Sequence, residues 1–220
     1  MKIAVLANGG WNPCWGKKEL AAVDYLICAD GGANAALAVQ RLPDVLIGDL
    51  DSVSRETLSL CRQNQVEIIQ YPSEKDETDL ELALQWAEQK IRKAALPDQR
   101  WEILLYGALG GRTDHLLGNL SLVLASARRG VYVRLKDPGQ ELWVVQGGDR
   151  LEIEGKPGQL ISLLPCGEPA CVSTEGLVYA LHHEELLPER VRGISNIMAA
   201  EKCVIEVHRG RVWAIQNILE

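Results

Sequence analysis

Hydrophobic and polar positions along the first 136 residues form two alternating kinds of segment. Short apolar runs end in polar or glycine-rich sequence, whereas the segments between them repeat apolar residues at helical spacing. Nearly unbroken apolar strands are expected where helices cover both faces of a parallel sheet. The pattern predicts strands at residues 2–7, 24–29, 45–48, 66–70, 102–106 and 131–136, and helices at residues 33–41, 54–64, 78–93 and 113–129.

Helical spacing disappears after Asp137-Pro138-Gly139. Short strands separated by Gly, Pro and Glu clusters are predicted at residues 141–145, 150–153, 159–164, 177–181, 203–208 and 211–216, and Arg209-Gly210 is typical of a hairpin turn. We therefore expect an α/β domain with a mainly parallel sheet at residues 1–137, followed by an all-β sandwich at residues 138–220.

Composition narrows the class of protein. A chain of 220 residues that is 47% hydrophobic can bury one large core or two modest ones. A net charge of −7 argues against nucleic acid or an anionic membrane as partner. The six cysteines include no CxxC pair and are interpreted as reduced core residues. The opening apolar run is too short for a signal peptide or a membrane span, so we expect a soluble cytoplasmic protein.

Four polar segments follow predicted strands of the first domain, where open α/β sheets collect their ligands. In the first segment, which runs from Asp30 to Asn34, Gly31 and Gly32 would let the backbone approach a nucleotide. The helix that follows offers its free N–H groups to phosphate. Taken alone, this segment is better explained by a tight turn with Asp30 as helix N-cap.

The second segment places Asp49 and Asp51 at a strand end, where a turn of the chain would let both carboxylates reach one Mg²⁺ ion. The competing interpretation is that Asp51 and Ser52 cap the next helix. The third segment holds Asp76 and Asp79, three residues apart, with Lys75 as a point charge for phosphate. Carboxylates in a first helical turn are also ordinary dipole compensation.

The fourth segment is a glycine loop that is neither a Walker loop nor GxGxxG. Gly110 and Gly111 could seat phosphates, Arg112 supplies a planar fork, and Asp114 is a candidate metal ligand or base. His115 is interpreted as a structural hydrogen-bonding residue. A nucleotide–magnesium site accounts for all four segments together, which helix capping does not.

The four motifs ADGGAN, PDVLIGDLDS, KDETDLELAL and GALGGRTDHLLGN, between residues 29 and 119, resemble those of thiamine pyrophosphokinases. Residues 173–177 are similar to the glycine-leucine segment of that family, and residues 193–196 to its Ser-Asn motif. The resemblance implies an N-terminal α/β domain, a C-terminal β-sandwich, and transfer of a pyrophosphoryl group from ATP to thiamine.

The resemblance also implies roles for individual residues. Asp49, Asp51 and Asp79 would hold magnesium, with Asp76 in the same acidic cluster and Arg112 near the transferred group. Members of the family are homodimers with thiamine at the subunit interface. Ser195 and Asn196 would therefore face a neighbouring subunit, and Trp213 would stack on thiamine; the alternative is a core or edge tryptophan of the sandwich.

Two other functions remain open. A pyrophosphokinase for another alcohol, such as a hydroxymethyl pterin, would need the same ATP-binding half, and a non-catalytic nucleotide sensor would use the same loops. Ile197 and Met198 stand where the family frequently has a polar or acidic residue, and the chain has no phenylalanine. Residues 11–16 have no counterpart in the resemblance and are expected to form a lid or a loop anchor.

Overall fold

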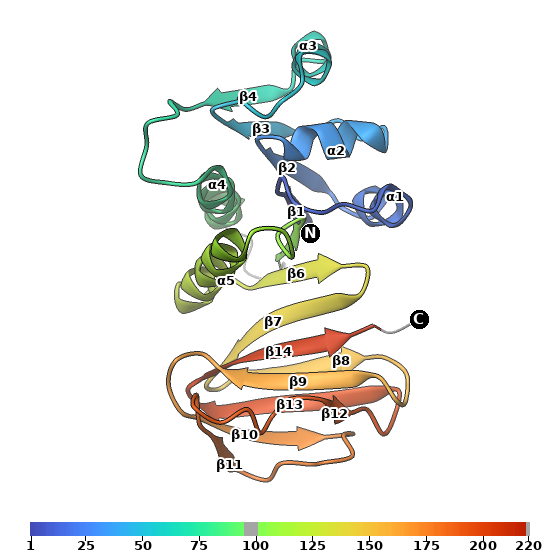
Figure 1. Ribbon diagram of the computed structural model, residues 1–220, viewed down its shortest axis with the longest axis vertical. Coiled ribbons are helices and arrows are strands. Elements are labelled where there is room, and N and C mark those ends of the chain that lie inside the picture. The colour runs from blue at the N-terminus through green and yellow to red at the C-terminus, as the bar shows by residue number, and fades with distance from the viewer. Residues whose placement is uncertain (95–100, 219–220) are drawn as a thin grey trace. The chain divides into compact units, whose positions relative to one another are not determined.

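The computed structural model describes residues 1–94 and 101–218 of the chain, which form two compact units, Met1–Leu122 and Val123–Glu220 (Figure 1). The division falls inside a helix, upstream of the boundary predicted after residue 137. The elements of the first part are β1 (Lys2–Leu6), α1 (Pro13–Ala21), β2 (Tyr25–Ala29), α2 (Gly32–Ala38), β3 (Val45–Gly48), α3 (Arg55–Gln63), β4 (Glu67–Gln70), α4 (Asp79–Ala94), β5 (Glu102–Tyr106) and α5 (Thr113–Arg128).

The first unit contains a parallel sheet in the order β4-β3-β2-β1-β5, which confirms the predicted α/β class. Successive side chains of a strand point to opposite faces. Leu6, Leu26 and Leu46 accordingly pack with residues of α1, α2 and α3, whereas α4 packs on the other face (Figure 1). Burial on both faces explains why the strands are almost wholly apolar.

Helix α1 was not predicted and includes most of the unmatched segment at residues 11–16. The side chain of Asn12 accepts a hydrogen bond from the Trp15 amide and caps the helix, and Pro13 occupies its first turn. A Cβ atom on Gly16 would lie 1.9 Å from the Trp11 ring, so the indole packs directly on the helix backbone. Trp11 and Trp15 form edge contacts with Tyr106, which makes this segment part of the core of the first unit.

The second unit is a two-sheet β-sandwich, as the sequence predicts. One sheet has the order β6-β7-β14-β9-β12 and the other β11-β10-β13-β8, all through antiparallel pairs. Buried residues of both sheets form one core. The strands are β6 (Val133–Asp137), β7 (Gln140–Gln146), β8 (Arg150–Glu154), β9 (Leu160–Pro165), β10 (Ala170–Glu175), β11 (Glu184–Leu186), β12 (Asn196–Ile197), β13 (Lys202–Arg209) and β14 (Arg211–Asn217).

Two predictions for the second unit were wrong, and three of its strands were missed. Residues 177–181 form no strand beyond an isolated bridge from Leu177 to Met198, and β10, β11 and β12 were not foreseen. The predicted hairpin at Arg209-Gly210 is instead a crossing between sheets, because β13 pairs with β8 and β10 while β14 pairs with β7 and β9. Gly210, with φ of 77°, makes the turn, so alternation located both strands but did not reveal their partners.

All six cysteines are unpaired, as expected. Cys28, Cys61, Cys166 and Cys203 are buried, but Cys14 is exposed and Cys171 only partly covered, so the core assignment was wrong for these two. None of the helices in the described residues is long and apolar enough to span a membrane.

Candidate functional site

A pocket of about 730 Å³ lies at the carboxyl ends of the parallel strands in the first unit. Segments that follow β1, β2, β3 and β5 meet there with the first turns of α4 and α5, as the sequence predicts for its four polar segments. The polar and charged side chains that line it are Asn8, Asp30, Asp49, Asp51, Ser52, Thr78, Asp79, Glu81, Arg112, Asp114, His115 and Asn119.

Three carboxylates converge at the floor of this pocket. Asp30, Asp49 and Asp79 each present an oxygen, and the three oxygens lie within 4.8 Å of one another. One oxygen of Asp30 and one of Asp79 are buried without a hydrogen bond. Buried, unsatisfied carboxylate oxygens are costly unless a cation or a donor faces them. An all-oxygen set of this kind fits a hard divalent cation such as Mg²⁺.

Backbone geometry brings the carboxylates together. Leu50, between Asp49 and Asp51, has φ of 69°, and Asp30 has φ of 45°, both in the left-handed region that non-glycine residues rarely occupy. Gly48 is required beside them, because its φ is 151° and a Cβ atom there would lie 3.1 Å from the Asp79 carboxyl carbon. The chain therefore turns sharply at the ends of β2 and β3.

Lys75 is the cation nearest to these carboxylates. Its Nζ lies 3.1 Å from an oxygen of Asp79 and 3.8 Å from one of Asp49, and it donates a hydrogen bond to the Pro72 carbonyl. The Asp79 oxygen is also one of the two without a hydrogen bond, so the contact is an ion pair without hydrogen-bond alignment. One ammonium group against three carboxylates leaves an excess of negative charge.

The environments of two of the carboxylates differ. Burial raises the pKa of Asp30 above its ordinary value, and the backbone N–H of Asp51, which donates to Asp49 over 3.1 Å, is the main cause of a lowered pKa for Asp49. Without a cation in the pocket, the charged form is therefore stabilised for Asp49 and destabilised for Asp30.

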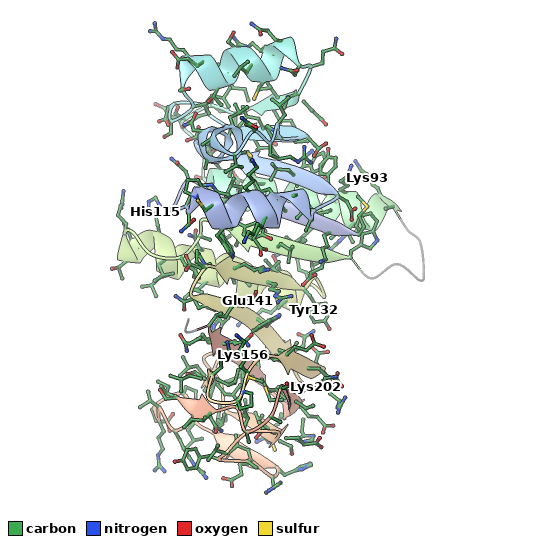
Figure 2. The ribbon with its side chains drawn as sticks, turned by 90° about the vertical axis from the view of Figure 1, so that its right-hand side faces the viewer. Lys93, His115, Tyr132, Glu141, Lys156 and Lys202 are labelled. Atoms are coloured by element: carbon green, nitrogen blue, oxygen red, sulfur yellow. The ribbon has the colours of Figure 1, made fainter. Side chains whose placement is uncertain are left out.

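The glycine loop before α5 also lines the pocket. Gly110 and Gly111 have φ of 77° and 71° and both line the pocket. Arg112 donates two hydrogen bonds to Asp114, of 3.1 and 2.5 Å, and this contact is the main reason that the pKa of Asp114 falls to about 2. Both side chains are largely exposed, so the guanidinium is accessible to a ligand. His115, labelled in Figure 2, follows them in the first turn of α5.

Not all predicted residues line the pocket. Gly31 and Gly32 do not line it. They pack against the end of β1 instead, where a Cβ atom on Gly31 would collide with Asn8 and one on Gly32 with the Leu6 carbonyl. Asn34 instead joins α2 to the loop after β3, donating to the Ser52 carbonyl over 2.8 Å and accepting from the Ser54 amide over 3.0 Å. Their packing positions the loop that carries Asp49.

The acidic segments also differ from their predicted arrangement. Asp51 lines the pocket but is not among the three convergent carboxylates, and Asp76 is exposed and outside the lining. The alternative capping roles are wrong: α2 has no side-chain cap at its first turn, and Ser54 rather than Asp51 or Ser52 caps α3.

Sequence reasoning missed the contribution of the first strand. Asn8 and Gly9 follow β1 and line the pocket, and a Cβ atom on Gly9 would lie 2.0 Å from the Gly107 carbonyl. The signal was present as the Asn-Gly-Gly run after the first apolar segment. The sequence placed Asp30 among the candidate nucleotide-binding residues, and only the fold shows that its carboxylate lies beside those of Asp49 and Asp79.

The predicted acceptor-binding residues belong to the second unit. Ser195 has φ of 59°, and its amide donates to the Ser162 hydroxyl. The side chain of Asn196 is bonded to the backbone of Tyr179, accepting over 3.0 Å and donating over 2.7 Å. Trp213 is partly buried on β14, while its neighbours in that strand point into the sandwich core. Trp213 is therefore not a core residue, and the alternative of a structural tryptophan outside the core stays open.

Comparison with known proteins gives consistent matches. The family model for the catalytic domain of thiamin pyrophosphokinase matches residues 17–135, and that for its vitamin B1 binding domain matches residues 150–212. Thiamine pyrophosphokinase from Bacillus subtilis is 30% identical over 192 residues, which cover 87% of this chain and 86% of the relative. Thiamine pyrophosphokinase 1 from Arabidopsis thaliana is 29% identical over 208 residues, covering 86% and 76%.

Solved structures agree with these matches. The crystal structure of thiamine pyrophosphokinase from Bacillus subtilis superposes with a TM-score of 0.84 at 25% identity and covers 99% of both chains. A thiamin pyrophosphokinase family protein from Enterococcus faecalis gives a TM-score of 0.81 at 26% identity over the whole of both chains.

Proposed function

Because this chain belongs to the thiamin pyrophosphokinase family, an enzyme family, we propose that its acidic pocket transfers a pyrophosphoryl group from ATP to the hydroxyl of thiamine. The observation that carries the proposal is the convergence of Asp30, Asp49 and Asp79 beside a glycine loop. A bond forms between the thiamine oxygen and the β-phosphorus of ATP, the bond from that phosphorus to the α-phosphate oxygen breaks, and AMP leaves.

Three carboxylates are proposed to hold Mg²⁺. Asp49 and Asp79 were candidates from the sequence, and Asp30 joins them because its oxygen lies within the same cluster. The bound ion would neutralise charge on the phosphate oxygens of ATP. Asp51 borders the pocket and is proposed to support this site, while Asp76 keeps only a peripheral role because it is exposed.

The remaining pocket residues bind and orient phosphate. Backbone N–H groups at Gly110 and Gly111 and at the first turn of α5 are suited to an anion. Arg112 is held in place by Asp114 and presents a planar guanidinium to the transferred group. Lys75, which is paired with Asp79, supplies a second positive charge beside the carboxylates. The proton of the attacking hydroxyl passes to one of the pocket carboxylates.

The second unit is proposed to bind the acceptor. The vitamin B1 binding model spans Ser195 and Asn196 and ends one residue before Trp213. We propose that residues 1–137 form the ATP- and magnesium-binding domain of a cytoplasmic homodimer. Residues 138–220 form its thiamine-binding and dimerisation domain. The outward position of Trp213 on β14 supports stacking on a flat cationic ligand. Neither a pterin acceptor nor a nucleotide sensor is favoured by the comparisons.

The test is incubation of the purified chain with ATP, Mg²⁺ and thiamine, followed by chromatography of both products. We expect AMP and thiamine diphosphate in equal amounts. ADP with thiamine monophosphate would contradict the transfer type. Turnover of a hydroxymethyl pterin in place of thiamine would contradict the acceptor, and ATP binding without any product would favour the sensor.

A further inference from the structure

A second pocket, of about 500 Å³, lies at the other edge of the sheet in the first unit. It is formed where strands begin, by the residues just before β1 and β5, the first residue of β4 and the carboxyl-terminal half of α4. Its volume is within the usual range for small-molecule sites. The residues that matter here are Glu67, Trp86, Gln89, Lys90, Lys93 and Trp101.

The pocket has an aromatic wall that is fixed in place. Trp86 stacks on Tyr25 with ring centroids 5.5 Å apart and an angle of 9° between the planes. The Nζ of Lys90 lies 3.8 Å from the centroid of Tyr25 and 5.2 Å from that of Trp86. These contacts hold one indole rigid, while Trp101, also partly exposed, borders the pocket from the start of β5. Rigid, partly exposed indoles are suited to stacking with a planar ring.

The charge of this pocket is opposite to that of the chain. Two lysines, Lys90 and Lys93, line it against a single carboxylate, Glu67, in a protein with a net charge of −7. Lys93 is exposed at the end of α4 (Figure 2), and no ion pair found among residues 1–94 and 101–218 includes either lysine. Lys90 is engaged by the aromatic stack, so Lys93 carries the charge that is free to meet a ligand.

We propose that this pocket binds a planar aromatic anion of mononucleotide size, with its ring stacked on the indoles and its phosphate or carboxylate group at Lys93. The amide of Gln89 supplies an adjacent hydrogen-bonding group. A triphosphate with its metal ion is a poor match, because the pocket offers only one lysine beyond the aromatic stack. The proposal does not depend on the function of the acidic pocket.

Helix α4 links the two pockets directly. Asp79 is its first residue and Lys93 lies in its last turn, so one rigid element about 24 Å long carries side chains of both sites.

Isothermal titration calorimetry with naphthyl phosphate tests the proposal. The full-length protein is titrated in the presence of saturating ATP and Mg²⁺, so that the acidic pocket is occupied, and naphthol and inorganic phosphate serve as the uncharged and non-aromatic probes. The variants are Lys93→Ala, Lys93→Glu, Lys93→Arg and Trp101→Ala. Lys17→Ala, an exposed lysine on α1 outside both pockets, is the matched control.

We expect one site for naphthyl phosphate and much weaker binding of naphthol and of phosphate. Lys93→Ala and Trp101→Ala should each weaken binding about tenfold, from loss of a charge-assisted hydrogen bond and of stacking. Lys93→Glu should abolish binding, while Lys93→Arg and Lys17→Ala should retain it. Binding of the probe only when ATP is omitted, absence of binding at millimolar probe, or unchanged affinity of the folded Lys93→Glu protein would each overturn the proposal.

Discussion

The two edges of the parallel sheet in the first unit differ in charge, in backbone geometry and in the source of their side chains. At the carboxyl edge, Asp30, Asp49 and Asp79 come together from three segments, and residues with positive φ turn the chain there. The amino edge takes two tryptophans and two lysines, and three of these four side chains come from α4 alone.

Part of this contrast follows from one helix. Acidic residues at the start of α4 and basic residues at its end also compensate the helix dipole, so the charges of Asp79 and Lys93 do not by themselves identify a site. Asp30 and Asp49 have no such explanation, because they come from β2 and β3 and lie beside Asp79 only through the fold. The carboxyl edge is therefore identified by charges that converge from separate elements, whereas the amino edge is identified by the aromatic residues that accompany the lysines of α4.

The largest expected effect is on turnover. Asp79→Asn should lower the rate of AMP formation about 10²–10³-fold, because it removes one of three carboxylates proposed to hold the ion that neutralises the phosphates. The matched variant Glu67→Gln, at the amino edge, should leave the rate unchanged. Equal rates for Asp79→Asn and the parent protein would remove the functional difference between the two edges.

Metal binding distinguishes the two edges in a measurement that does not require turnover. Magnesium at a hundredfold excess over its dissociation constant should raise the free energy of unfolding by about 2.7 kcal/mol and the melting temperature accordingly. Differential scanning calorimetry should show this shift for the parent and for Glu67→Gln, but not for Asp79→Asn. A shift of equal size in Asp79→Asn would place the ion elsewhere.

Close packing at the carboxyl edge should be visible in stability. Gly32→Ala should lower the free energy of unfolding by about 1–3 kcal/mol, because the new Cβ would lie 2.2 Å from the Leu6 carbonyl oxygen. Gly118→Ala, inside α5 with open space around it, should raise the free energy of unfolding by up to about 1 kcal/mol. Urea denaturation measures both, and a stable Gly32→Ala protein would show that the edge relaxes easily.

The smallest effect concerns the pH dependence of Asp30. Its pKa is raised in the folded state, so the folded protein binds the proton more tightly than the unfolded chain does. Its contribution to stability is present below the ordinary pKa of an aspartate and is lost as the pH rises through the folded-state pKa. In metal-free protein, Asp30→Asn should therefore be more stable than the parent at neutral pH.

Denaturation midpoints at neutral pH and below the ordinary aspartate pKa would test this trend. The advantage of Asp30→Asn should shrink in acid, where the parent aspartate is protonated. A variant that is less stable than the parent at neutral pH would show that the charged form of Asp30 is not strained.

The sequence predicted the first unit more accurately than the second. In the first unit the central strands are buried on both faces and every strand is followed by a helix, so apolar runs and helical spacing identify most of the elements and their parallel pairing. In the second unit, alternation located most strands but not their partners, because antiparallel strands in two sheets carry the same pattern. The crossing at Gly210 is the clearest example.

The sequence by itself determined the α/β and sandwich classes, the four polar segments at strand ends and the family that their motifs resemble. These features depend on local spacing and residue type, which a chain carries before it folds. The tertiary structure decided which carboxylates converge, placing Asp30 with Asp49 and Asp79 while leaving Asp76 exposed. It also brought Trp86 and Trp101 to one pocket. Strand order and backbone turns set these distances between residues that are remote in sequence, and the local spacing of residue types determines neither of them.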